Sequence, residues 1–252
     1  MLWYKSWLDT RWRFLIGLAL LLCSAAATVL TYPQLVKLLP LVPTNIQGPL
    51  GQRIRESAEL MRSYPSFVWS NWFRQNLSEG ATLFAVLLGT AGLLSHSGGA
   101  LFTLSLPVSR RRLLGVRAAA GLAELFVLVL VPSLLIPLLS PAIGERYGAG
   151  AALIHSVCLF TAASVFFSLA FLLSTIYSDV WRPLLIALAF AIVLALVDQL
   201  LLRSPAQSLF GVMRGETYFR AGRLPWEGLV ASAAVSAALF YGAVVNFARR
   251  DF

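Results

Sequence analysis

Long apolar runs alternate with shorter polar segments along most of this chain of 252 residues. A bilayer core about 30 Å thick needs about 20 residues of α-helix to cross it. The pattern therefore predicts an all-α integral membrane protein, with one transmembrane domain over residues 1–252. We expect six transmembrane helices, at about 14–32, 78–95, 113–139, 150–174, 183–202 and 227–247.

The first apolar run is predicted to be a retained helix. It is followed by the bulky Tyr32 and by Pro33, whereas a cleaved signal peptide ends in small residues. The third run contains Pro132 and Pro137, which should kink or end its helix because proline removes a backbone hydrogen bond. An even number of spans places both termini on one side of the membrane.

The segment before the first run has two faces when it is drawn as a helix. Its polar face holds Lys5, Ser6, Asp9, Thr10 and Arg13, and only Arg11 interrupts the apolar face. The apolar face is mostly aromatic, with Trp3, Tyr4, Trp7, Leu8, Trp12 and Phe14. This pattern is typical of a helix that lies in the membrane interface, and we expect one over residues 1–13.

Composition agrees with a membrane location. Hydrophobic residues make up 58% of the chain and charged residues only 12%, against about 25% charged in soluble domains. The net charge of +9 is explained by basic loops that contact anionic lipid headgroups, so we expect lipid contacts and no nucleic-acid partner. Cys23 and Cys158 fall within apolar runs and are expected to act as small hydrophobic side chains.

The distribution of charge predicts the orientation. With the N-terminus inside, ten basic residues fall on each side, but the inner ten lie in shorter segments close to helix ends, where the positive-inside bias acts. Six acidic residues dilute the outer set and three the inner set. We therefore expect a multi-pass protein of the plasma membrane with both termini in the cytoplasm.

The first outer segment, residues 33–77, is the longest and ends in an aromatic piece, "SFVWSNWFRQNL". Its aromatic side chains are expected to form an interface belt, since tryptophan favours the depth of the headgroups. The alternative is that they line an external vestibule.

Several kinds of catalytic site are missing from the sequence. The two lysines, Lys5 and Lys37, do not follow a glycine, so no P-loop is present, and no His-Glu-x-x-His zinc motif occurs. We expect no metal or cofactor on this chain and no enzymatic activity. One alternative is an intramembrane hydrolase that uses His155, although the adjacent Ser156 points away from it on a helix.

Apart from Glu79 and Glu227 at the outer edges of their spans, two acidic residues fall within predicted spans, Glu124 near the middle of the third and Asp198 near the outer end of the fifth. An acid inside a membrane is energetically costly and is a functional candidate. Asp198 lies close enough to the interface to be solvated. Glu124 either bonds across helices or carries protons, and the second alternative is therefore a proton-coupled secondary transporter.

The segment "GGALFTLSLPVSRRRLLGVRA", residues 98–118, lies between the second and third predicted helices. It resembles the corresponding segment of ABC-2-type transporter permeases, in which a Gly-rich stretch runs into a Leu-Pro-x-Ser-Arg element. The six spans, the interfacial helix and the long first outer loop agree with that family. One departure is that Ser95, His96 and Ser97 stand where the family usually has glutamate.

The resemblance implies that residues 96–108 form a cytoplasmic coupling helix that docks on a separate ATPase subunit. On this interpretation the chain is the permease subunit of an ATP-driven exporter, pairs with a second permease copy, and leaves ATP to its partner. Ser109 is a suitable N-cap for the third helix. The residues expected to couple are Gly98, Gly99, Leu101, Phe102, Leu104, Leu106, Pro107, Ser109, Arg110, Arg111 and Arg112.

Overall fold

The computed structural model describes residues 2–38, 48, 52, 58–90, 109–177, 179–201 and 208–249. These residues form helices, turns and short irregular segments, with no strand among them. Among the described residues, five helices are long and apolar enough to cross a membrane, which is compatible with the predicted multi-pass membrane protein. They are α1 (Leu2–Leu38), α6 (Arg110–Leu139), α7 (Ala149–Ile176), α8 (Trp181–Leu201) and α11 (Trp226–Ala248).

The last four of these helices begin and end within three residues of the expected spans. Ser109 caps α6 as predicted, because its side chain accepts a hydrogen bond from the backbone N–H of Arg112. Pro132 lies inside α6 without ending it, and the α-helix stops two residues after Pro137. A 3₁₀ turn, η3 (Ser140–Ile143), then continues the chain to Gly144, whose φ of 78° ends it.

The region of the expected second span differs from the prediction. Three helical segments follow one another without a break: α3 (Tyr64–Phe67), the π-helix η2 (Val68–Leu77) and α4 (Ser78–Gly89). The helical run thus begins 14 residues before position 78, and the expected end at 95 lies outside the described residues. The polar residues of this run are typical of an outer loop. The run is helical because the aromatic side chains between them pack into the bundle.

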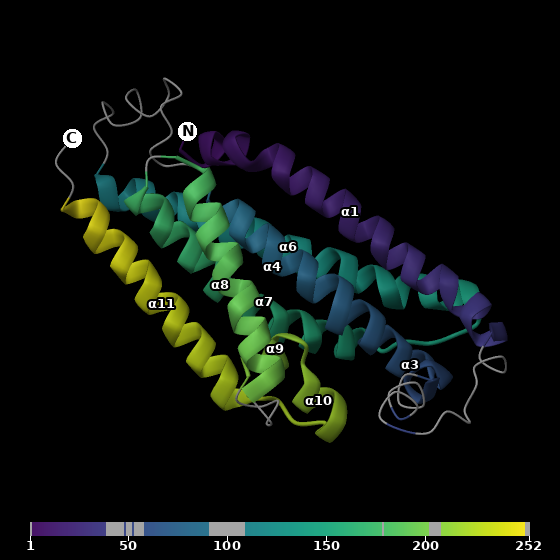
Figure 1. Ribbon diagram of the computed structural model, residues 1–252. Helices are drawn as coiled ribbons and strands as arrows, with labels where there is room; N and C mark the ends of the chain where they lie inside the picture. Colours follow the sequence, from purple (N-terminus) through teal and green to yellow (C-terminus); the bar gives the residue numbers. More distant parts are fainter. Residues whose placement is uncertain are drawn as a thin grey trace.

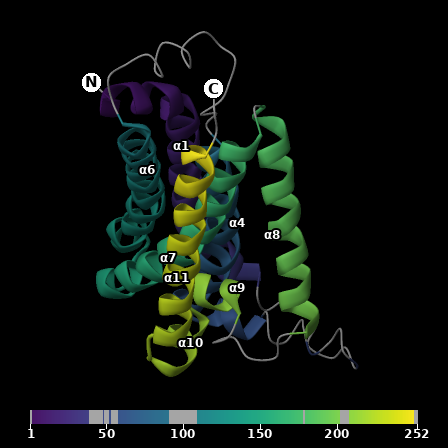
Figure 2. The same ribbon diagram turned by 90° about the vertical axis from the view of Figure 1, so that its left-hand side faces the viewer.

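The N-terminal segment is continuous with the first long helix rather than separate from it. Figure 2 shows that the first turns of α1 lie across the end of α6 before the helix turns along the bundle. The aromatic side chains Trp3, Tyr4 and Trp12 are exposed by 56, 68 and 65%, whereas Ser6 and Thr10 are buried. Most of the aromatic face is therefore turned away from the protein, which is typical of a helix in a membrane interface, whereas Phe14 at its end is buried in the bundle.

The helices pack around α7, which contacts α4, α6, α8, α9 (Leu209–Met213) and α11. The N-terminus, the start of α6, the turn between α7 and α8 and the end of α11 lie at one end of the bundle (Figure 1). At the other end lie α3, α9 and α10 (Glu216–Ala221) (Figure 1). We call these the inner and the outer end.

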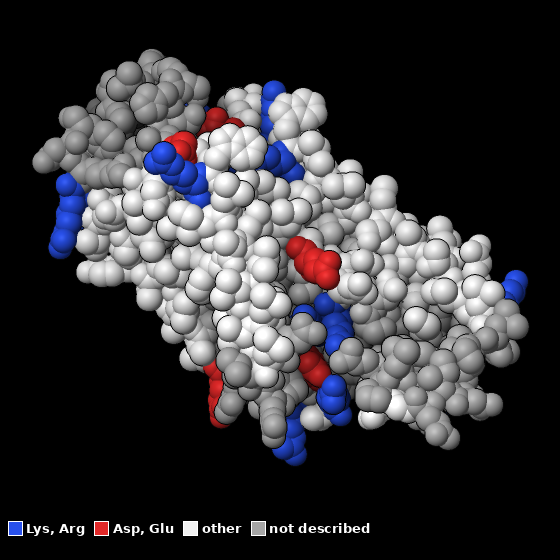
Figure 3. Space-filling model, in the orientation of Figure 1, with Lys and Arg blue, Asp and Glu red and all other residues white. Residues whose placement is uncertain are grey.

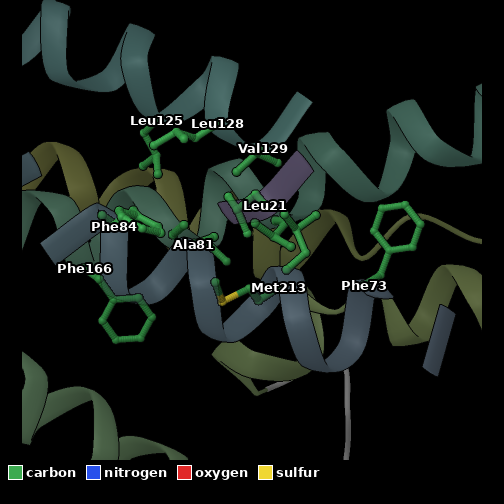
Figure 4. Close-up of a cluster of buried hydrophobic side chains, with 14 of the residues drawn as sticks. Leu21, Phe73, Ala81, Phe84, Leu125, Leu128, Val129, Phe166 and Met213 are labelled. Atoms are coloured by element: carbon green, nitrogen blue, oxygen red, sulfur yellow. The ribbon is translucent and has the colours of Figure 1, made fainter. Parts of the chain in front are cut away.

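Close packing in the bundle depends on small residues and aromatic rings. A side chain at Gly89 would place its Cβ 2.6 Å from the backbone oxygen of Phe167, so α4 and α7 approach there to backbone contact. Leu21, Phe84 and Met213, from α1, α4 and α9, converge in the core shown in Figure 4. The bundle is thus formed by residues from both ends of the chain.

Candidate functional site

Glu124, the predicted intramembrane acid, lies buried between α6 and the first turns of α1. Its Oε1 accepts a hydrogen bond of 2.6 Å from the Thr10 hydroxyl, and its exposed fraction is 6%. Its Oε2 has no hydrogen-bond partner among the described residues. Of the two roles considered from sequence, bonding across helices is the one that this geometry directly supports.

Charged side chains surround this contact at the inner end. Arg117 of α6 lies 4.0 Å from the Asp9 carboxylate of α1. Arg13 donates a hydrogen bond of 2.8 Å to the backbone oxygen of Leu87, near the end of α4. Two helices that border the expected coupling segment, α4 and α6, are therefore both tied to α1.

The expected coupling segment falls almost entirely outside the described residues. This applies to Gly98, Gly99, Leu101, Phe102, Leu104, Leu106 and Pro107. Ser109 and the helix start at Arg110 are described, and Arg111 and Arg112 are exposed at the inner end. The start of α6 lies beside the first turns of α1 (Figure 2).

His155, the residue of the hydrolase alternative, is packed among rings at the outer end. Its ring stacks on Phe73 with centroids 4.7 Å apart and meets the edge of Tyr218 at 5.4 Å. The Ser156 hydroxyl donates instead to the backbone oxygen of Ala152. In the described part of the chain, no hydrogen bond links His155 to a serine or an acid, and no cluster of three or more potential metal ligands occurs.

The π-helix η2 turns its aromatic side chains into the bundle. Trp69, Trp72 and Phe73 are exposed by 2% or less, so these rings form neither the expected interface belt nor a vestibule lining. The Asn76 side chain donates a hydrogen bond of 3.1 Å to Asn71, five residues earlier, because a π-turn aligns residues at this spacing. Extended π-helices are rare and often occur at functional sites.

The opposite face of the same run is polar and open. Arg74, Gln75 and Glu79 are exposed and Asn71 is half-buried; we call these four residues the polar stripe. A side chain at Gly80 would contact Leu21, which lies near the middle of α1. Glu79 is therefore near the middle of the bundle's length, where a charge facing lipid costs about 3 kcal/mol.

The polar stripe is not evident from the sequence, because Arg74 falls in the predicted outer segment 33–77 and Glu79 lies at the outer edge of the predicted span 78–95, where it counts among the outer charges. Figure 3 shows acidic and basic side chains following one another over α4 and toward α10, where the surface between them and the charged groups of the opposite end is largely uncharged. The signal that could have located it is the spacing of Asn71, Gln75 and Glu79, four residues apart, opposite Trp69, Trp72 and Phe73.

The chain between α8 and α11 folds back into the bundle beside this stripe. Four of the five residues of α9 are buried, and the Thr82 hydroxyl of α4 lies 3.7 Å from the sulfur of Met213. The indole N–H of Trp69 donates to the backbone oxygen of Arg214, at 3.0 Å. Non-helical backbone is tolerated at membrane depth only where protein or water surrounds it, and here the bundle provides that environment.

Arg214 lies within electrostatic range of both the polar stripe and the chain between α8 and α11. Burial lowers the pKa of its guanidinium, and the charge of Arg74 acts in the same direction, whereas Asp198, Glu216 and Glu79 oppose the shift. All four side chains are thus close enough to act on Arg214 electrostatically. Arginine stays protonated in proteins, so the site keeps positive and negative groups together.

Comparisons of this chain with protein-family models, with curated proteins and with solved structures gave no match.

Proposed function

We propose that the chain is the permease subunit of an ATP-driven exporter of the ABC-2 type. In this proposal two copies form the translocation path, and separate ATPase subunits bind at the inner end. The chain itself binds no ATP and catalyses no reaction. The run Tyr64–Gly89 counts as the sixth crossing, which gives six spans with both termini in the cytoplasm of a plasma-membrane protein.

The polar stripe is the observation that carries this proposal. Charged and amide side chains halfway along a membrane-spanning run are costly against lipid, and such residues usually face a water-filled path or another polar surface. A single chain leaves the stripe open on its own surface. A second copy that meets this face, with the path formed between the two copies, accounts for both its depth and its exposure.

The inner end supports the position of the ATPase. Residues 91–108 connect the end of α4 to the start of α6, and Arg13 and Asp9 link α1 to both helices. In this proposal a displacement of this connection moves α4 and α6 directly and α1 through its contacts with them. Glu124, by contrast, is enclosed and bonded to Thr10, which gives the proton-coupled alternative less support.

The test is co-purification combined with transport. A C-terminally tagged chain is solubilised in mild detergent, and its stoichiometric partners are identified. We expect an ATPase subunit, which is lost when Leu104, Arg110 and Arg111 are replaced together by alanine. The matched control is Arg146→Ala, an exposed arginine at the outer end, which should leave the complex intact. Unchanged association and transport in the triple variant would contradict the proposal.

A further inference from the structure

The two charges of the polar stripe have no oppositely charged partner in their own run. Arg74 and Glu79 are both exposed, and within the described ranges no ion pair of 4 Å or less includes either of them. The guanidinium of Arg74 instead lies 5.7 Å from the centre of the Trp69 ring. By comparison, Glu216 and Arg220 of α10 form an ion pair of 2.6 Å within the chain.

The spacing of the two charges has a geometric consequence for a dimer. Copies inserted in the same orientation are related by a two-fold axis along the membrane normal, so that their helical runs lie parallel. In such a pair residues of the same number lie at the same depth, so Arg74 of one run and Glu79 of the other are offset by at most about 7.5 Å along the axis, which a long arginine side chain can bridge. Arg74 and Glu79 are separated by five residues and have opposite charges.

The neighbouring residues provide the rest of such a surface. Gln75 and Glu79 are followed after four further residues by Leu83, which is 42% exposed. Together they form one face along the run, with amide and charged groups toward the outer end and an apolar side chain toward the inner end. A second copy of this face is complementary to it in charge.

We propose that the polar stripe is an interface between two copies of this chain, in which Arg74 of each copy forms an ion pair with Glu79 of the other. This inference rests on the proposed function for the presence of a second copy. It places the second copy against the face that carries the polar stripe, with two symmetric ion pairs between the copies. Each pair removes two charges from contact with lipid.

The test uses charge reversal in two differently tagged copies. Arg74→Glu alone produces acid–acid contacts in its homodimer, and Glu79→Arg alone produces base–base contacts. When the two variants are co-expressed, both contacts between unlike copies again join opposite charges. We expect each variant alone to lose at least about tenfold in dimer affinity, because like charges that face each other repel strongly, and the mixed dimer to recover.

The readout is pull-down of one tag by the other in detergent and in nanodiscs, with Arg146→Glu as the control for a reversed surface charge. The double variant Arg74→Glu/Glu79→Arg should form a homodimer again. If a single variant fails to fold alone, recovery of both chains in the co-expressed mixture decides the result. If the dimer affinity is the same in all these variants, or if the co-expressed mixture dimerises no better than the single variants, the proposal is overturned. That result would favour a lipid or a substrate at the polar stripe.

The same samples separate this inference from the proposed function. ATPase co-purification with an unchanged dimer in every charge variant would leave the exporter proposal intact and refute the ion pairs. Charge-dependent dimers without any ATPase subunit would support the interface and contradict the exporter.

Discussion

Replacing Thr10 by valine tests the buried contact between α1 and α6. The substitution keeps the volume and the branched shape of the side chain. It removes the hydroxyl that donates a hydrogen bond of 2.6 Å to Glu124. Because Oε2 of Glu124 already lacks a partner among the described residues, the variant leaves both carboxyl oxygens without a protein donor there. The carboxyl group is only 6% exposed, so bulk water cannot readily replace the hydroxyl.

Two ranges of free energy set the loss of stability that we expect for Thr10→Val. Hydrogen bonds between membrane helices contribute about 0.6 kcal/mol on average and at most about 1.7 kcal/mol. Leaving a buried acceptor unsatisfied costs about 1–3 kcal/mol. We therefore expect Thr10→Val to lower the free energy of unfolding by about 1–2 kcal/mol.

Glu124→Gln provides the matched comparison. Its amide oxygen still accepts the bond from Thr10, and the charge is removed, so we expect a change within about 0.5 kcal/mol. The double variant Thr10→Val/Glu124→Leu removes both partners. It should be less destabilised than the sum of Thr10→Val and Glu124→Leu measured singly, since the interaction is counted twice in that sum.

The assay is denaturant unfolding of the purified chain in detergent micelles, followed by the fluorescence of its seven tryptophans. Equal stability of Thr10→Val and wild type would refute the contact. Transport gives a second result from the same variants: under the proposed function Glu124→Gln still transports with ATP, whereas its loss in a stably folded variant would favour proton coupling through Glu124.

Two other substitutions test the packing of α7. Gly89→Ala places a Cβ against the backbone oxygen of Phe167, and we expect it to lower the free energy of unfolding by about 1–3 kcal/mol. The control is Gly115→Ala, where no atom lies within 4 Å of the added Cβ, and it should be neutral or stabilising in the same unfolding assay. Ser236→Ala removes the 2.5 Å hydrogen bond between Ser236 of α11 and Ser168 of α7, and we expect it to lower the free energy of unfolding by about 1 kcal/mol. An unchanged stability would contradict this contact.

Hydrophobicity alone determined much of this fold. A long apolar run can satisfy its backbone in lipid only as a helix, so four long helices could be located from their sequence to within three residues. The cap at Ser109 was also predictable, because it depends on one local hydrogen bond. The acid Glu124 could be singled out as costly, but its partner Thr10 lies 114 residues away and was not predictable.

Only the tertiary structure decided the character of residues 64–77. The piece "SFVWSNWFRQNL" mixes apolar and polar residues in equal number, and such a mixture is compatible with a loop. Packing against α1, α7 and α10 buries Trp69, Trp72 and Phe73, and the helix then presents Arg74 and Glu79 on its open face. The physical reason is that the apolar and polar pattern along the chain shows how many side chains avoid water, whereas the direction in which each one points is set by neighbours distant in sequence.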